Sequence, residues 1–188
     1  MLKGFRRVLV LLAPAAAVAG IATASAQPMQ FHVGGERTTI TPTPQALQFL
    51  AARHVEVSAC GGATLASDGA LVLPILSGTV TAQPMNGVIR HQGCVVFKHE
   101  GRKLVFKDFV LKRDHDRAVL TAIVGGDDPI LFARVDRFAV QSVGDEAVVT
   151  GRLRLGAEAA QRFNKLLSPG AVAPGTELGN LKSILRFT

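Results

Sequence analysis

The strongest constraint on the fold is an alternation of apolar and polar residues, with a period of two, through most of the chain after residue 70. In "ALVLPIL", Leu71, Leu73 and Ile75 fall on one face, and "EAVVTGRLRL" alternates in the same way. Successive side chains of a strand point to opposite faces, so this period predicts half-buried β-strands. Crossover helices, which a parallel sheet needs, are missing between these stretches, so the pattern favours antiparallel pairing.

Polar turn signals separate the predicted strands. His99-Glu100-Gly101-Arg102 links "GVIRHQGCVVFK" to "RKLVFKDFVLK", which is typical of a hairpin, and "RDHD", "GGDD" and "SVGD" separate the later stretches. Short strands at this spacing predict a β-sandwich or a barrel.

Two segments have helical rather than strand spacing. In the first, Thr43 is placed to cap a helix that begins at Pro44 and carries an apolar stripe with Leu47 and Leu50. The second is "GAEAAQRFNKLLSPG", where apolar residues recur at helical spacing before the Ser-Pro-Gly stop. The sequence therefore predicts a mainly β fold, an antiparallel β-sandwich or barrel-like domain with two short helices.

The N-terminus has the three parts of a secretory signal peptide. A positive region with Lys3, Arg6 and Arg7 precedes an apolar run, and Ala24-Ser25-Ala26 supplies small residues for cleavage after Ala26. The alternative is a retained membrane anchor, but Pro14 and Gly20 interrupt a run that is short for a span.

The resulting domain prediction has three segments. Residues 1–26 are the signal peptide, residues 27–38 a flexible leader with a joint at Gly34-Gly35, and residues 39–188 a single β domain. No segment after the signal is apolar for long enough to cross a membrane as a helix. We expect the protein to be secreted or associated with the cell envelope.

The charge of the chain favours weak contacts with anionic surfaces. Removal of the signal peptide, with its three basic residues and no acidic ones, lowers the formal net charge from +7 to +4. The remaining basic residues form no run, and an exported chain without a basic stripe is a poor nucleic-acid binder. The expected partner is an envelope component or a small ligand.

The chain contains two cysteines, Cys60 and Cys94. Export to an oxidising compartment and an even cysteine count favour a disulfide between them, and the alternative is two unpaired thiols on separate strands. A metal site is not expected, because the close-spaced ligand pair that is usual in zinc sites is missing.

The histidines are better explained as structural than as chemical groups. His91 is in phase with Ile89, Val95 and Phe97 on the core-facing side of its strand, unless Gly93 introduces a bulge. His99 lies in a predicted hairpin turn. His115, between two aspartates, lies in another. Enzyme signatures such as a nucleophile elbow, a zinc-protease motif or a phosphate-binding glycine loop are missing, so we predict no catalytic residues and no enzymatic activity. The alternative is an exported hydrolase whose catalytic residues are distant from one another in the sequence.

The second half of the chain resembles the HtaA-type domain of actinobacterial envelope proteins, some of which take part in haem uptake. The resemblance covers about residues 70–188 and rests on "GVIRHQGCVVF", "RKLVFKDFVL", "AVLTAIVGG", "GRLRLGAEAAQRFNKLL" and the closing "VAPGTELGNLKSIL". It implies a non-enzymatic, envelope-associated binding or structural protein.

The resemblance also raises the question of haem. Haem-binding members of the family use a tyrosine as the axial ligand, with a histidine and an arginine nearby, but this chain contains no tyrosine. The alternative function is therefore binding of haem or another small hydrophobic ligand with an atypical axial residue. His91, His99 and His115 are the candidate ligands, and Met29 and Met85 could ligate iron in principle. The primary expectation is that no cofactor is bound.

The cleavage site gives the first testable prediction. Because the small-residue motif ends at Ala26, the exported protein should begin at Gln27. N-terminal sequencing of protein from the envelope fraction measures this directly, and a chain that still begins at Met1 would contradict it.

Overall fold

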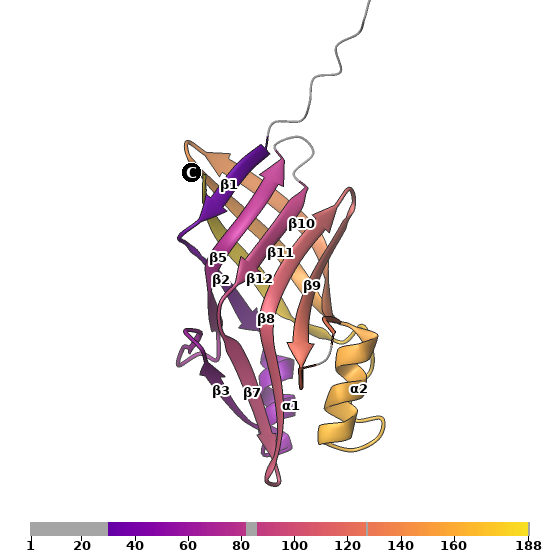
Figure 1. Cartoon of the computed structure of the whole chain (residues 1–188). Helices are drawn as coiled ribbons and strands as arrows, with labels where there is room; N and C mark the ends of the chain where they lie inside the picture. Colours follow the sequence, from indigo (N-terminus) through magenta and orange to yellow (C-terminus); the bar gives the residue numbers. More distant parts are fainter. Residues whose placement is uncertain (1–29, 82–85, 127, 188) are drawn as a thin grey trace, which may run out of the picture.

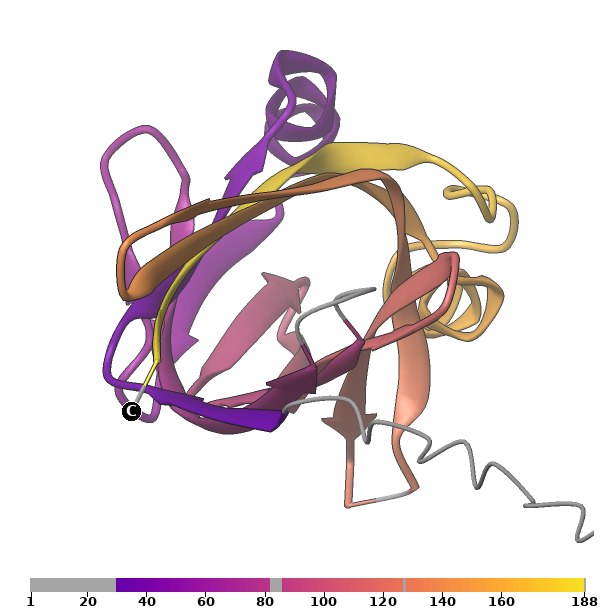
Figure 2. The ribbon, with the colours of Figure 1, turned by 90° about the horizontal axis from the view of Figure 1, so that it is seen from above.

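The computed structural model describes residues 30–81, 86–126 and 128–187. One antiparallel sheet curls into a closed barrel, and two helices lie at one end of it (Figures 1 and 2). We call the end that carries the helices the lower end, as it is drawn in Figure 1. The predicted cleavage site and the signal peptide lie outside the described residues.

The elements follow one another along the chain with short connections. The strands are β1 (Gln30–Gly34), β2 (Arg37–Pro42), β3 (Glu56–Cys60), β4 (Thr64–Leu65), β5 (Leu71–Thr81), β6 (Gly87–His91), β7 (Cys94–His99), β8 (Arg102–Asp114), β9 (Arg117–Val124), β10 (Ile130–Val143), β11 (Glu146–Leu155) and β12 (Glu177–Phe187). The helices are α1 (Pro44–Ala52) and α2 (Ala157–Leu166).

Eight strands close the barrel. Antiparallel pairing runs from β5 through β6, β8, β9, β10, β11, β12 and β2 and back to β5. The alternating residues place their apolar side chains inside, with Leu73, Leu120, Leu153 and Leu185 fully buried. The predicted barrel-like fold with two short helices is confirmed, and closure leaves these strands without the unpaired edges that a sandwich would retain.

The predicted leader is wrong for its described residues. Residues 30–34 form β1, which pairs with β5 and with the end of β12, and the chain from residue 37 onward forms β2 of the barrel. Val33 is buried, so this segment contributes to the core instead of preceding it. The alternation is too short here to be recognised in the sequence. Gly34 ends β1, and Gly35, with a φ of +79°, lies in the tight connection to β2.

The stretch "GVIRHQGCVVF" divides at Gln92-Gly93. Its first half, β6, pairs with β5 and closes the barrel, whereas its second half, β7, leaves β5 and pairs with β3. Gly93 is required at this point, because its φ is +104° and a Cβ would lie 2.6 Å from the Cβ of Ala63. The prediction that Ile89, His91, Val95 and Phe97 share the core-facing side is confirmed, since all four are buried.

The lower end is held by a cluster of phenylalanines. Phe106 lies 5.0 Å from Phe132 and 5.5 Å from Phe163 between ring centroids, and Phe97 lies 4.8 Å from Phe163. Such aromatic contacts add to the free energy of burial. They fix α2 against the barrel through its predicted apolar stripe.

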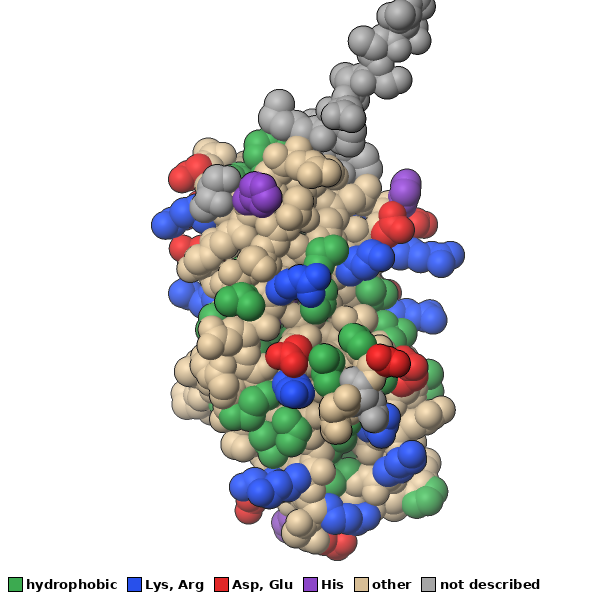
Figure 3. Space-filling model, in the orientation of Figure 1, with side chains coloured by type: hydrophobic (Ala, Val, Ile, Leu, Met, Phe, Trp, Pro, Cys, Tyr) green, Lys and Arg blue, Asp and Glu red, His purple; other side chains and the backbone are tan. Residues whose placement is uncertain are grey.

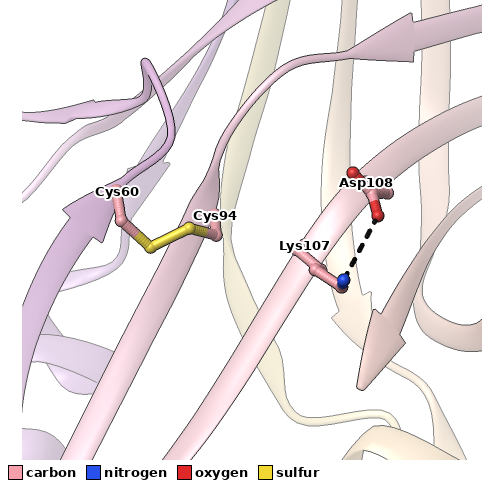
Figure 4. Close-up of a disulfide and its surroundings, with 4 residues drawn as sticks. All are labelled: Cys60, Cys94, Lys107 and Asp108. Atoms are coloured by element: carbon pink, nitrogen blue, oxygen red, sulfur yellow. Dashed lines mark ion pairs between the residues drawn. A yellow bond between two sulfur atoms is a disulfide. The ribbon is translucent and has the colours of Figure 1, made fainter. Parts of the chain in front are cut away.

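The predicted disulfide between Cys60 and Cys94 is present. Figure 4 shows it between β3 and β7, where the two residues are direct partners in the ladder. Among the described strands, β3 has β7 as its only partner in the ladder, so the bond fixes a strand that is otherwise held along one side.

Removal of this bond should destabilise the protein. For a sequence separation of 34 residues, the chain-entropy relation gives a loss of about 3–4 kcal/mol. Chemical denaturation of a Cys60→Ala/Cys94→Ala variant measures the loss, and reduced wild-type protein is the matched control. Thiol labelling of the unfolded, unreduced wild type should find no free thiol, and two labelled thiols would contradict the pairing.

Candidate functional site

His91 lies inside the barrel at the centre of a buried chain of hydrogen bonds. Its Nδ1 is 3.1 Å from the carbonyl oxygen of Phe109, its Nε2 is 2.6 Å from Oγ1 of Thr38, and that oxygen is 2.7 Å from Oγ of Ser183. A carbonyl only accepts, so Nδ1 donates to Phe109, the Thr38 hydroxyl donates to Nε2, and Ser183 donates to Thr38. The chain joins β6, β8, β2 and β12.

A bulge in β8 makes this carbonyl available. The pairing of β8 with β9 shifts between Lys107 and Val110, and at the same place β8 changes partner from β7 to β6. Asp108, within the bulge, has a φ of +52°. His91 therefore satisfies a backbone acceptor at the level where the strand divides, and both of its ring nitrogens have a partner.

Burial controls the protonation of His91. Desolvation lowers the pKa of His91 from 6.5 to about 4, although the bond to Phe109 opposes the shift. The imidazole is neutral at physiological pH, and neither nitrogen has a free lone pair for a metal. This arrangement agrees with the structural role that its phase predicts.

The other two candidate histidines lie at opposite ends of the molecule. His115 occupies the β8–β9 turn, with an 82% exposed side chain and Nδ1 2.6 Å from Oδ1 of Asp114. His99 ends β7 at the lower end, with its Nε2 3.7 Å from Oε2 of Glu100. Met29 and Met85 lie outside the described residues. The structure brings no two of His91, His99 and His115 into contact, and no group of three or more metal-binding side chains occurs among residues 30–81, 86–126 and 128–187.

An apolar cavity of about 490 Å³ lies at the lower end, where β7 has left the barrel. Its walls come from α1, from β3, β4 and β7, from the barrel strands β2, β5, β10 and β11, and from α2 and the segment 171–178. They include Leu50, Val57, Val95, Phe97 and Leu178. Pockets that hold small organic ligands have this size and this type of lining. The cavity is the candidate functional site.

Helix α1 covers the cavity and is only partly packed against the core, through the half-buried side chains of Phe49 and Leu50. Thr43 caps it as predicted, since Oγ1 of Thr43 accepts from the amide of Ala46 at 3.1 Å. Ala46, Phe49 and Leu50 face the cavity, yet none of the nine residues of α1 is buried. By contrast, α2 buries four. The apolar face of α1 is therefore packed less closely than that of α2.

Two polar side chains in the cavity wall, those of Glu177 and Thr176, already have partners. Glu177 pairs with Arg152, at 3.4 Å, and with Arg154, at 3.7 Å. The hydroxyl of Thr176 donates to the carbonyl of Ala173 at 2.7 Å. The cavity thus presents mainly apolar surface to a ligand, and these two side chains need nothing from one.

The stripe of α1 is evident in the sequence, but the cavity beneath it is not. The walls of the cavity come from segments that are distant in the sequence, and only the folded chain brings them together. One feature of the sequence points to the cavity: the predicted helix carries three large apolar residues, Leu47, Phe49 and Leu50, within four positions.

Comparisons with solved structures show the fold. The C-terminal domain of HtaA from Corynebacterium glutamicum matches with a TM-score of 0.66 at 15% identity, over 84% of this chain and 99% of that one. The N-terminal domain of the same protein matches with a TM-score of 0.58 at 14% identity, over 82% of this chain and 98% of that domain. The heme-binding protein HtaB from that organism matches with a TM-score of 0.57 at 12% identity, over 86% of this chain and 96% of that one. No family model and no curated protein matches the sequence.

The fold is therefore HtaA-like, as the sequence resemblance predicts. Within the described part of the chain, neither helix has the length and apolar character needed to cross a membrane.

The buried position of His91 predicts a pH-dependent stability. Burial lowers the pKa of His91 from 6.5 to about 4 in the folded protein. The neutral imidazole therefore contributes its full share to the free energy of unfolding above pH 6.5, and this share is lost as the pH falls from 6.5 to 4. The loss amounts to about 3 kcal/mol. The free energy of unfolding of His91→Gln should be lower at pH 7 and should depend less on pH within this window.

His115→Gln is the matched control, since it removes an exposed imidazole that takes no part in the buried chain of hydrogen bonds. Urea denaturation at pH 7, 5.5 and 4.5 measures all three proteins. If the free energy of unfolding changes with pH equally in the wild type and in His91→Gln, the role of the buried imidazole is contradicted.

Proposed function

We propose that this chain, with its HtaA-like fold, is an exported, non-enzymatic binding protein of the cell envelope that holds a small apolar ligand beneath α1. The observation that carries the proposal is the pairing of a 490 Å³ apolar cavity with a covering helix that has no buried residue. A ligand in the cavity would add to the partial packing that Phe49 and Leu50 of α1 make against the core.

The energetics favour occupancy by an apolar molecule. Each 100 Å² of apolar surface removed from water contributes about 2.5 kcal/mol, before the cost of immobilising the ligand. The mouth is marked by the partly exposed side chains of Leu47 and Leu65, which a ligand would also shield. Polar wall atoms that already have partners do not oppose this gain.

Haem is the ligand that the fold suggests, since HtaB is a heme-binding protein. The residues present do not fit haem held by an axial bond, because histidine, cysteine, methionine, tyrosine and lysine are all missing from the described lining. His91 has both nitrogens engaged. His99, at the end of β7, and His115, on a turn at the upper end, both lie outside the lining of the cavity. We therefore propose a ligand held by packing rather than by a metal bond.

Two further observations support the remaining parts of the proposal. The disulfide and the signal-like N-terminus both suit a protein outside the cytoplasm. The one buried histidine takes part in a hydrogen-bond chain that joins strands, so it offers no free base for catalysis. Binding is the activity that the cavity supports.

The proposal predicts that the neutral fluorescent probe N-phenyl-1-naphthylamine binds in a saturable manner. Ala46→Trp should abolish this binding, because Ala46 faces the cavity and an indole would occupy it. Ala52→Trp introduces the same side chain at an exposed position of α1 outside the lining, and should bind as the wild type does. Fluorescence titration measures both, and equal binding by the two variants would contradict the site.

Titration with hemin tests whether haem is held by apolar contacts or by an axial bond from a histidine to its iron. If hemin binds, substitution of any one of His91, His99 and His115 by alanine should leave its Soret spectrum unchanged. A saturable one-to-one Soret shift that one of these substitutions abolishes would contradict the proposal and would identify the axial ligand.

A further inference from the structure

A row of basic side chains follows the outer face of β8. Lys103, Lys107 and Lys112 are exposed, whereas the inward-facing residues between them are buried. An odd and an even position share one face of a strand only where an extra residue changes the phase. The bulge between Lys107 and Val110 supplies this residue, so the irregularity that frees a carbonyl for His91 also keeps Lys112 on the outside of the barrel.

Neighbouring strands widen this row. Arg90 of β6 is exposed, and its partner on β8 is Val110. On the other side, Arg134 of β10 lies in line with Lys112, because both pair with Val119 of β9. Four of these cations have no ion pair within the described part of the chain, and we call them the basic wall: Arg90, Lys103, Lys112 and Arg134.

The acidic side chains on this side of the barrel do not neutralise the basic wall. Asp108 lies 3.9 Å from Lys107, as Figure 4 shows, and Glu56 is opposite Lys98 in the ladder. The others lie at the two ends of β8: Glu100, Asp114 and Asp116. On β11 and β12, by contrast, the arginines have carboxylate partners: Arg152, Arg154 and Arg186.

An exposed leucine lies beside the basic wall. The pairing of β5 with β6 shifts between Ile75 and Ser77, and Leu76 in this bulge is 66% exposed. Ser77, the next residue, is the ladder partner of Arg90. The apolar residues between the cations are half-buried: Val88, Val110, Val119 and Ile123. In Figure 3, basic side chains lie among apolar ones on the face that β5, β8 and β9 form in Figure 1.

This combination of charge and apolar surface suits an anionic bilayer. Lysine and arginine stems lie along apolar surface while their charges reach phosphate groups, and an exposed leucine enters the interface between headgroups and acyl chains. The outer wall of a closed barrel is convex, so long side chains are needed to reach a flat surface. A soluble polyanion would satisfy the cations but would leave Leu76 in water.

We infer that the protein docks on an anionic lipid bilayer through the outer wall of its barrel, with the basic wall at the lipid phosphates and Leu76 in the apolar interface. None of these five residues lines the apolar cavity. The inference therefore goes beyond the proposed function, and each can fail without the other.

Co-sedimentation of the exported form, residues 27–188, with lipid vesicles at low salt tests the inference. Vesicles of equal parts phosphatidylglycerol and phosphatidylcholine should bind it at least about tenfold more tightly than vesicles of phosphatidylcholine alone. Each basic residue near an anionic bilayer strengthens binding by about fivefold, so Arg90→Gln/Lys112→Gln should weaken binding to the mixed vesicles at least about tenfold.

The matched control is Arg37→Gln/Lys182→Gln, which removes one arginine and one lysine at exposed positions of β2 and β12. Strand β12 is four strands from β8 in either direction round the barrel, so it lies on the opposite wall. This variant should keep the wild-type affinity to within about twofold. All four substituted residues are exposed, and both variants should unfold at the same urea concentration as the wild type.

Leu76→Ser separates a bilayer from a soluble polyanion. It should weaken binding to the mixed vesicles about tenfold, since a leucine side chain leaves the apolar interface, and should leave binding to inorganic polyphosphate unchanged. Three results would overturn the inference: no preference for the anionic vesicles, equal losses in the two double variants, or no effect of Leu76→Ser on vesicle binding. Binding to polyphosphate without binding to vesicles would also overturn it and would assign the basic wall to a soluble polyanion.

Discussion

The division of one strand at Gln92-Gly93 is the constraint on which the rest of this structure depends. Above it, β6 closes the barrel against β5; below it, β7 follows β3 and leaves a gap in the wall. Gly93 permits the change of direction, since any side chain there would collide with Ala63. The bulge in β8 and the hydrogen bonds of His91 lie at the same level and satisfy the backbone that the division exposes.

The two halves of the molecule differ in packing because of this division. The upper half is a closed barrel with a filled interior, held by direct ladder pairing and the chain from Ser183 through Thr38 to His91. The lower half adds β3, β7, the two helices and the segment 171–178, and these elements line the apolar cavity together with residues of the barrel strands β2, β5, β10 and β11. A disulfide fixes β3, whereas no residue of α1 is buried. Rigid walls beneath a lightly packed cover suit a binding site that admits its ligand.

The sequence was most informative where a local pattern determines the outcome. The alternation predicted the barrel strands, Thr43 and Pro44 predicted the start of α1, and the phase of His91 predicted its burial. Residues 30–38 were misassigned, because five-residue β1 is stabilised by pairing with β5 and β12 rather than by its own pattern. The cavity could not be predicted, since Val57, Phe97 and Leu178 meet there only through the division of the strand and the return of β12.

The central claim is that α1 covers a cavity whose packing a ligand completes. Hydrogen–deuterium exchange of the mature protein, with and without saturating N-phenyl-1-naphthylamine, tests it most directly. The account predicts fast exchange of the amides of residues 47–52 in the free protein and at least about tenfold slower exchange with the probe bound, with no change in the β10–β11 hairpin at the upper end of the barrel. Exchange in α1 that is already slow in the free protein, or that the probe does not alter, would contradict it.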